Sequence, residues 1–151
     1  MDGLSELPVL YRVALGPKEL PPEKGSYLLC FTAANPFTAT IGRLGKFDFE
    51  SGGYVYCGSA FGPGGIKARV GRHFKKRKKK RWHVDYVRPH LSLDRVITAP
   101  GEHNECKWSQ LLVQADYNNP VPKFGASDCR CFSHFFEVGG KDIVSLLLNE
   151  Q

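Results

Sequence analysis

The sequence predicts a small mixed α/β domain whose sheet is covered by helices on one face. Short runs rich in aromatic and β-branched residues, bounded by Gly, Pro or Asn, are typical of strands. Longer segments with apolar residues three or four positions apart are typical of amphipathic helices. These segments follow one another in the order strand, strand, helix, helix, strand, helix, strand, helix. At 151 residues, this alternation fits one domain with a layered core.

The first part of the chain divides into an irregular lead-in and a strand. Residues 1–24 hold four prolines and are expected to be irregular, although their apolar side chains can still pack on the domain. Residues 25–151 are expected to form the folded domain. It opens with Gly25–Ala33 (GSYLLCFTA), whose nearly continuous apolar run predicts a buried strand, and Asn35-Pro36 ends that strand.

A hairpin arm and a second strand are expected next. The weakly alternating segments 38–41 and 46–49 predict the arm, and Gly52-Gly53 is a turn signal. Residues 54–59 (YVYCGS) predict a strand because aromatic and β-branched residues dominate them. A glycine-rich loop over 58–65 then leads into the first helix.

Two helices are expected between this loop and the third strand. The first covers about residues 65–76, and the second, shorter one covers 81–87 and is stopped by Pro89. Apolar side chains spaced by four give the first helix one buried stripe. This stripe consists of Ile66, Val70 and Phe74.

The C-terminal part predicts two more strand–helix pairs. Residues 93–99 (LDRVITA) predict the third strand, and Asn104 is a suitable N-cap for the helix that follows. A strand near 134–138 and a helix from about residue 142 complete the order. The stripe of the helix after Asn104 consists of Trp108, Leu111, Leu112 and Ala115.

The positive charge of the chain is concentrated in one run. The formal net charge is +6, and residues 75–81 are seven adjacent cations. Such cations repel one another, so a polyanion gains most from them through phosphate contacts and counterion release. The run therefore favours a nucleic-acid partner, with DNA expected and RNA not excluded. A solvated charge run or a localisation signal are the alternatives.

Composition also restricts the cellular setting. No apolar run approaches the length of a membrane span, and the N-terminus lacks the pattern of a signal peptide. Five scattered cysteines do not form the framework of a disulfide-rich secreted domain. We expect a cytoplasmic protein, associated with the nucleoid if it is prokaryotic.

Several short motifs occur in an informative order. Gly25–Tyr27 and Tyr56–Gly58 lie on the first two predicted strands, and Arg69 precedes His73 by one helical turn. Glu105 opens the helix after the third strand. Together these motifs resemble the GIY-YIG nucleases, over roughly residues 25–116. The resemblance implies a small central, mainly antiparallel sheet of three to four strands flanked by helices.

Two further segments resemble a stand-alone branch of that family, which consists of small uncharacterised GIY-YIG domain proteins. They are Trp82–Tyr86 (WHVDY) and Ser127–Cys131 (SDCRC), the latter followed by Ser133-His134. The sequence departs from the usual GIY-YIG pattern at Ser26 and Cys57, and Ser59 stands where excision-repair relatives carry a lysine.

The resemblance implies a metal-dependent endonuclease that hydrolyses phosphodiester bonds in DNA and is directed by structure or damage, as an enzyme of DNA repair would be. It implies catalytic roles for Tyr27, as the base or water-orienting group, and for Tyr56, as a positioning group. Arg69 and His73 would stabilise the phosphate, and both lie beside the apolar stripe, where they can point at a ligand. Glu105 would hold a single Mg²⁺ or Mn²⁺. These residue types suit the reaction, because phosphodiester hydrolysis needs a cation at the developing charge and an activated water.

Nucleic-acid contacts are expected from polar and basic residues around this site. Arginine and lysine contacts to phosphates would hold the backbone without reading its sequence, and Trp82 can stack on an unpaired base. These residues are Ser59, Lys67, Arg72, Lys75, Lys76, Arg77, Lys78, Lys79, Lys80, Arg81, Trp82 and His83.

Two other functions remain open from the sequence. The altered motifs also fit a nucleic-acid-binding module that does no chemistry. A lysine near the site could instead cleave abasic strands through a Schiff base.

A second polar group in the C-terminal part is ambiguous. Cys129, Cys131 and His134, with Cys106, can supply four zinc ligands. The tight Cys-x-Cys spacing and the distant Cys106 favour a turn with packed thiols instead.

Overall fold

The computed structural model describes residues 11–126, 129–140 and 143–149. A five-stranded antiparallel sheet has the order β1-β6-β2-β5-β7. Its strands are β1 (Arg12–Ala14), β6 (Ser92–Pro100), β2 (Gly25–Ala33), β5 (Gly52–Ala60) and β7 (Phe135–Glu137). A separate two-stranded arm pairs β3 (Phe37–Thr40) with β4 (Lys46–Phe49). The predicted mixed α/β class with a mainly antiparallel sheet is therefore confirmed, but the sheet has five strands rather than three or four, because the short strands β1 and β7 pair at its two edges.

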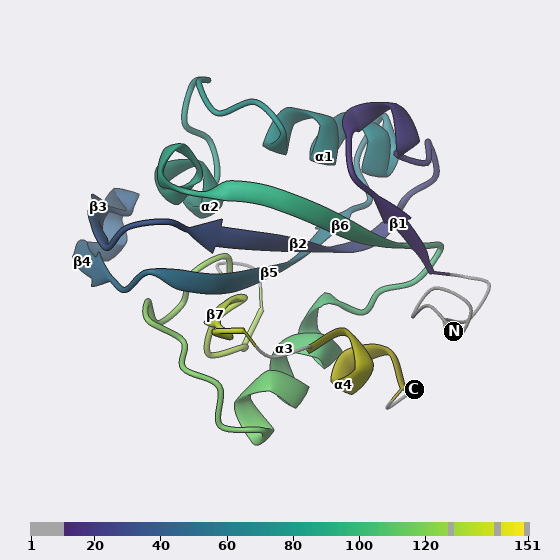
Figure 1. Ribbon diagram of the computed structural model, residues 1–151. Helices are drawn as coiled ribbons and strands as arrows, with labels where there is room; N and C mark the ends of the chain where they lie inside the picture. The colour runs from purple at the N-terminus through teal and green to yellow at the C-terminus, as the bar shows by residue number, and fades with distance from the viewer. Residues whose placement is uncertain (1–10, 127–128, 141–142, 150–151) are drawn as a thin grey trace.

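Helices cover both faces of the sheet. The first pair, α1 (Gly65–His73) and α2 (His83–Val87), lies on one face, and α3 (Glu105–Gln114) and α4 (Ile143–Asn149) lie on the other (Figure 1). Short 3₁₀ turns occupy Pro17–Glu19, Gly42–Leu44 and Arg88–His90. None of the described helices has the length and apolar character that crossing a membrane requires.

The prediction that helices cover only one face is wrong. Strand β2 sends alternate residues to two separate cores, Tyr27 and Leu29 to the core under α1, and Leu28 to the core under α3. A strand that is buried on both faces needs apolar residues at nearly every position. The continuous apolar run of β2 already carried this information.

Three boundaries differ from the sequence-based expectation. Within the lead-in expected to be irregular, Arg12–Ala14 pairs with β6 as an edge strand. The Gly52-Gly53 pair does not form the turn but belongs to β5, where Gly53 lies opposite Thr32. Helix α1 ends at His73, before the basic run, because positive residues close to one another gain little from a helical arrangement.

Candidate active site

The register of β2 and β5 places two tyrosines on the same face of the sheet. Tyr27 lies opposite Gly58, and its ring centroid is 6.4 Å from that of Tyr56. A Cβ atom on Gly58 would come within 2.4–2.5 Å of the Tyr27 ring, so only glycine leaves room for that ring. The Tyr27 ring thus explains why the second motif has glycine at position 58. Tyr27 itself is completely buried.

A glycine of a later loop packs against the second tyrosine. A Cβ atom on Gly125 would lie 2.9 Å from the ring of Tyr56, and the φ angle of Gly125 is +68°, which favours glycine. Residues 58 and 125 thus make space for the two rings from two distant parts of the chain.

Helix α1 delivers His73 to this tyrosine pair. The Tyr27 hydroxyl and His73 Nε2 are 2.9 Å apart and form a hydrogen bond. His73 is only 1% exposed, so the expectation that it points outward at a ligand does not hold. The histidine lies beneath the surface, with its ring against both tyrosines.

Burial controls the protonation of this group. Burial, followed by the charge of Lys78, lowers the pKa of His73 to about 3, so its ring is neutral at neutral pH. Burial, followed by the charge of Tyr56, raises the pKa of Tyr27 far above 10, while nearby Arg69 opposes that shift. Burial raises the pKa of Tyr56 to about 12. Both tyrosines therefore keep their protons.

Arg69 lies between the buried group and the surface. Its guanidinium carbon is 4.0 Å from the centroid of the Trp82 ring, and its charge acts on the Tyr27 hydroxyl. Arg69 Nε is buried and has no hydrogen-bond partner in the described part of the chain. Arg72 and Arg81 also lie near the Trp82 ring, at 4.5 and 5.5 Å.

These side chains line a surface cavity of about 350 Å³, a size suited to a small ligand group. The cavity wall combines three guanidinium groups with the start of α1 and the loop before it. Its lining consists of Ala60, Gly62, Pro63, Gly65, Ala68, Arg69, Arg72, Arg81 and Trp82.

Asp85 organises the basic loop that forms one side of this cavity. Its carboxylate accepts two hydrogen bonds from Arg72 Nη1, at 2.9 and 3.0 Å, and others from the backbone N–H groups of Arg81 and Trp82. Burial acts to raise the pKa of Asp85, but these donors and the Arg72 charge outweigh it and the pKa is lowered. Asp85 thus binds the loop to α2 as a permanent anion.

The cations of the basic run and of the end of α1 consequently differ in their contacts. Arg72 is paired with Asp85, and Lys78 donates to the carbonyl oxygen of Arg72 and lies 3.7 Å from Asp85. These two cations hold the loop together, whereas the other predicted lysines and arginines of this region are exposed. The exposed ones are Lys67, Lys75, Lys76, Arg77, Lys79, Lys80 and Arg81.

The other two predicted nucleic-acid contacts lie partly inside the fold. His83 Nδ1 accepts a hydrogen bond of 2.7 Å from the Gly125 backbone, and its ring packs on Phe124. Ser59 is half-buried at the end of β5, opposite Ser26. His83 therefore acts as a tether between α2 and the loop that contacts Tyr56.

Glu105 begins α3, on the face of the sheet opposite α1 (Figure 1). Its Oε2 atom is buried and has no hydrogen-bond partner among the described residues, so it is available to a cation. The hydroxyl of Ser26, next to Tyr27, donates to Glu102 O at 2.8 Å and accepts from the Asn104 N–H at 3.2 Å. Ser26 thereby fixes the turn from which α3 starts, which explains a polar residue in the first motif.

Arg88 is a positioning residue that the sequence did not reveal. It is buried, and its guanidinium donates to the carbonyl oxygens of His73 at 2.6 Å, Phe74 at 3.3 Å and Leu91 at 2.6 Å. It therefore satisfies the C-terminal carbonyls of α1, where a cation is favoured. An arginine before Pro89 carries no signal that would separate it from an ordinary surface arginine.

The structure thus brings together Tyr27, Tyr56, Arg69 and His73, and Arg69 is the member of this group that lines the basic cavity. Glu105 lies at the start of α3, on the other face of the sheet. A family model described as "domain of unknown function DUF123" matches residues 26–150. The chain belongs to this family. The match begins at Ser26 and includes every one of the five residues just named. No curated protein and no solved structure matches the chain significantly.

Proposed function

We propose that this member of the DUF123 family is a metal-dependent endonuclease of the GIY-YIG type that hydrolyses phosphodiester bonds in DNA. The observation that carries the proposal is the buried, partnerless Nε of Arg69, which lies beside the hydrogen-bonded Tyr27–His73 pair at a basic cavity. A buried guanidinium donor without a partner is costly. A phosphate oxygen is a suitable acceptor for it.

Arg69 supplies the charge in this mechanism. Its guanidinium is permanently protonated and held over Trp82, so it can stabilise the negative charge that grows on the phosphate without reorganising. His73 contributes no positive charge at neutral pH, because burial lowers its pKa to about 3. Its role is instead to fix the Tyr27 hydroxyl through their hydrogen bond.

Tyr27 acts as a neutral hydroxyl that orients the attacking water. Burial raises its pKa, so a resting phenolate base is unfavourable, and its hydroxyl is held in place by the hydrogen bond with His73. Tyr56 packs beside it and limits how the substrate enters.

A divalent cation fits Glu105, whose buried Oε2 lacks a protein partner. Carboxylates are the ligands that Mg²⁺ and Mn²⁺ prefer, and Mg²⁺ needs only one or two of them. When bound, such an ion would activate water and polarise the phosphate. Glu105 starts its helix after the end of β6, which pairs with the start of β2, so it lies at the end of the sheet where β2 begins.

The exposed cations of the basic run hold the DNA backbone in this proposal. Because they contact phosphates rather than bases, the enzyme selects substrates by structure or damage rather than by sequence. The affinity for DNA, and with it the cleavage rate at low DNA concentration, should therefore fall steeply with added salt.

The first experiment is a cleavage panel of labelled single-stranded, duplex, flap, junction and abasic DNAs with Mg²⁺ or Mn²⁺. Arg69→Ala should lower the cleavage rate by about 10²–10³, the cost of losing one donor to transition-state charge. Arg43→Ala is the matched control, because Arg43 is an exposed arginine of the β3–β4 arm. Binding to all these DNAs without cleavage in either metal would replace the nuclease with the non-catalytic module.

Lys78 motivates the lyase alternative. Burial, partly offset by Asp85, lowers its pKa to about 8, which brings an amine closer to the range of a nucleophile. Its amine is engaged with Arg72 O, however, and that contact favours a structural role. Borohydride trapping of a covalent adduct on abasic DNA, lost in Lys78→Met, would favour the lyase over the hydrolase.

A further inference from the structure

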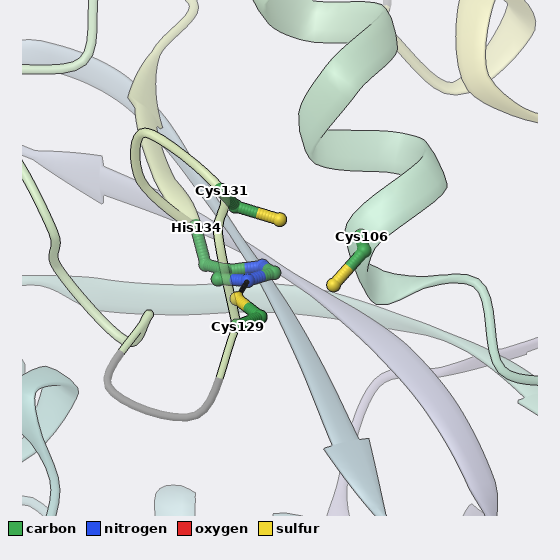
Figure 2. Close-up of side chains that lie close together, drawn as sticks. All are labelled: Cys106, Cys129, Cys131 and His134. Carbon is green, nitrogen blue, oxygen red and sulfur yellow. Dashed lines mark hydrogen bonds between the residues drawn. The ribbon is translucent and has the colours of Figure 1, made fainter.

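Four potential metal ligands gather on the face of the sheet opposite the tyrosine pair. Cys106 comes from the first turn of α3, whereas Cys129, Cys131 and His134 come from the segment that leads into β7 (Figure 2). One ligand atom from each of the four residues lies within 4.8 Å of all the others. The sequence-based expectation of thiols packed under a turn, with Cys106 far away, is therefore replaced by a compact group.

The dimensions of this group suit a tetrahedral ion. With Zn–S of about 2.3 Å and Zn–N of about 2.1 Å, the edges of a tetrahedral site with three sulfurs and one nitrogen measure roughly 3.6–3.8 Å. The sulfur of Cys129 is already 3.2 Å from His134 Nε2. The upper limit of 4.8 Å on the other separations is about 1 Å longer than such an edge.

The histidine presents the correct nitrogen to the thiols. The Ser109 hydroxyl donates its one proton to the carbonyl oxygen of Glu105 at 2.9 Å. In its second hydrogen bond, with His134 Nδ1 at 2.7 Å, the Ser109 oxygen must therefore be the acceptor. His134 Nδ1 therefore carries the hydrogen, and the lone pair of Nε2 faces Cys129. Metal-binding histidines are commonly oriented in this way by a hydrogen bond from the other ring nitrogen.

The backbone also holds His134 in place. Its carbonyl oxygen accepts from the Cys57 N–H on β5 at 2.9 Å, and its N–H donates to Phe124 O at 2.8 Å. His134 and Cys131 are 3% and 9% exposed. Cys106 and Cys129 are half-buried. Two of the four ligands are thus buried, and hydrogen bonds fix the backbone of His134, which preorganises this part of the site.

We propose that Cys106, Cys129, Cys131 and His134 bind one structural Zn²⁺ ion. Three thiolates and one imidazole form a closed tetrahedral set with no position left for substrate, which is typical of structural zinc. On binding, each thiol releases its proton to solvent and each sulfur donates an electron pair to the ion, with no change of oxidation state. Soft sulfur ligands disfavour Mg²⁺, so this ion is distinct from the cation proposed at Glu105.

The ion would join two parts of the fold that are distant in sequence. Cys106 follows Glu105 directly, so zinc would tie the first turn of α3 to the segment entering β7. The site is expected to contribute to stability, because metal that binds only the folded chain stabilises it. Its presence does not depend on the nuclease proposal.

The test uses the full chain, produced with zinc in the medium and purified under reducing conditions. Elemental analysis should find about one zinc per chain. Displacement of that zinc should release three thiols to a thiol reagent. Replacement by Co²⁺ should give the sulfur-to-metal charge-transfer band and the intense visible bands of tetrahedral thiolate coordination.

Variants then assign the ligands. Cys106→Ser, Cys131→Ser and His134→Ala should each lose most of the bound zinc, whereas Cys129→His, which keeps a ligand atom, should retain more. Cys30→Ser is the matched control, since Cys30 is a half-buried cysteine of β2 outside the cluster. If the ligand variants fail to fold, the zinc content and the cobalt spectrum of the parent protein still decide the question.

Three results would overturn the proposal. The first is a parent protein that lacks stoichiometric zinc and shows no tetrahedral cobalt spectrum. The second is a disulfide between two of these cysteines in the reduced preparation. The third is a loss of zinc in Cys30→Ser that equals the loss in the ligand variants. Failure of the nuclease proposal looks different, because zinc would be bound normally while no DNA is cleaved.

Discussion

The two faces of the central sheet carry different polar chemistry, although the same strands supply both. On β5, Tyr56 turns toward α1 and the guanidinium groups, whereas its neighbour Cys57 packs on the α3 side, where the thiols gather. The α1 face holds hard donors and permanent positive charge beside a surface cavity. The α3 face holds three soft sulfur ligands, which are buried or half-buried, beside a buried histidine.

This difference indicates that the two faces serve different functions. Open, charged groups with an unpaired donor suit an anionic substrate that arrives and leaves. A closed ligand set that joins distant segments suits a permanent structural ion. Because the sheet lies between the α1 cavity and the thiols, a substitution on the α1 face should leave the zinc content intact, and this independence can be tested.

The largest effect is expected for Asp85→Ala. It removes the acceptor of Arg72 and of two backbone N–H groups and leaves those donors unpaired. Breaking such a partly buried pair should lower the free energy of unfolding by about 3 kcal/mol, measured by urea denaturation. Zinc content should not change.

Asp85→Asn is the milder companion, because it removes the charge but keeps an oxygen acceptor. The free energy of unfolding of Asp85→Asn should lie between those of the parent and of Asp85→Ala. Loss of bound zinc in a folded Asp85 variant would contradict the independence of the two faces.

Gly58→Ala should have the next largest effect. The new Cβ would lie 2.4–2.5 Å from the Tyr27 ring, so that ring must move away from His73. Overpacking of this kind costs roughly 1–3 kcal/mol, and DNA cleavage should fall more than stability does.

Gly71→Ala is the control for this substitution. Gly71 lies within α1, and a Cβ atom there would meet no other atom within 4 Å. Alanine should therefore stabilise the helix slightly, by up to about 1 kcal/mol. Equal cleavage by Gly58→Ala and Gly71→Ala would mean that the Tyr27 position is unimportant.

The sequence predicted the elements better than the contacts between them. Strand β2 was predicted with its observed ends, because the apolar run is bounded on both sides by breaking residues. The grouping of Tyr27, Tyr56, Arg69 and His73 followed from motif order. The burial of His73 did not follow, because a helix stripe defined by Ile66 and Val70 does not show how far the neighbouring strands reach.

Other contacts carry no local sequence signal at all. Asp85 and Arg88 act by reaching segments 10 or more positions away, as in Arg72–Asp85 and His73–Arg88. The meeting of Cys106 with Cys129 depends on the packing of α3 beside the segment entering β7. Spacing rules for metal ligands work only when all ligands lie close in sequence.

The pH dependence of stability gives a finer test of the α1 face. Burial lowers the pKa of His73 to about 3, against 6.5 for a free histidine, so the unfolded chain binds this proton and the native chain does not. Stability is therefore full above pH 6.5 and decreases as the pH falls toward 3. The groups that face His73 are Tyr27, Tyr56, Arg69, Arg72, Lys78 and Asp85.

His73→Gln removes this titration while keeping a polar side chain. The slope of unfolding free energy against pH, measured in urea between pH 4 and 6, should decrease by about 1.4 kcal/mol per pH unit. The other histidines with lowered pKa, His83 and His134, are present in both proteins and cancel. An unchanged slope would show that His73 accepts a proton in the native state.

The smallest effect is expected for Ser26→Ala, at the position where the two faces meet. It deletes the hydroxyl that donates to Glu102 O and accepts from the Asn104 N–H, so a buried N–H is left unpaired ahead of Glu105. Stability should fall by about 1–2 kcal/mol, and cleavage should need more Mg²⁺ for half-maximal rate. Thr32 lies on the same strand as Ser26, and Thr32→Ala loses only an exposed hydrogen bond to Asp94 of β6, so it should leave the Mg²⁺ requirement unchanged. If both variants need the same Mg²⁺ as the parent, Glu105 does not depend on the turn that Ser26 holds.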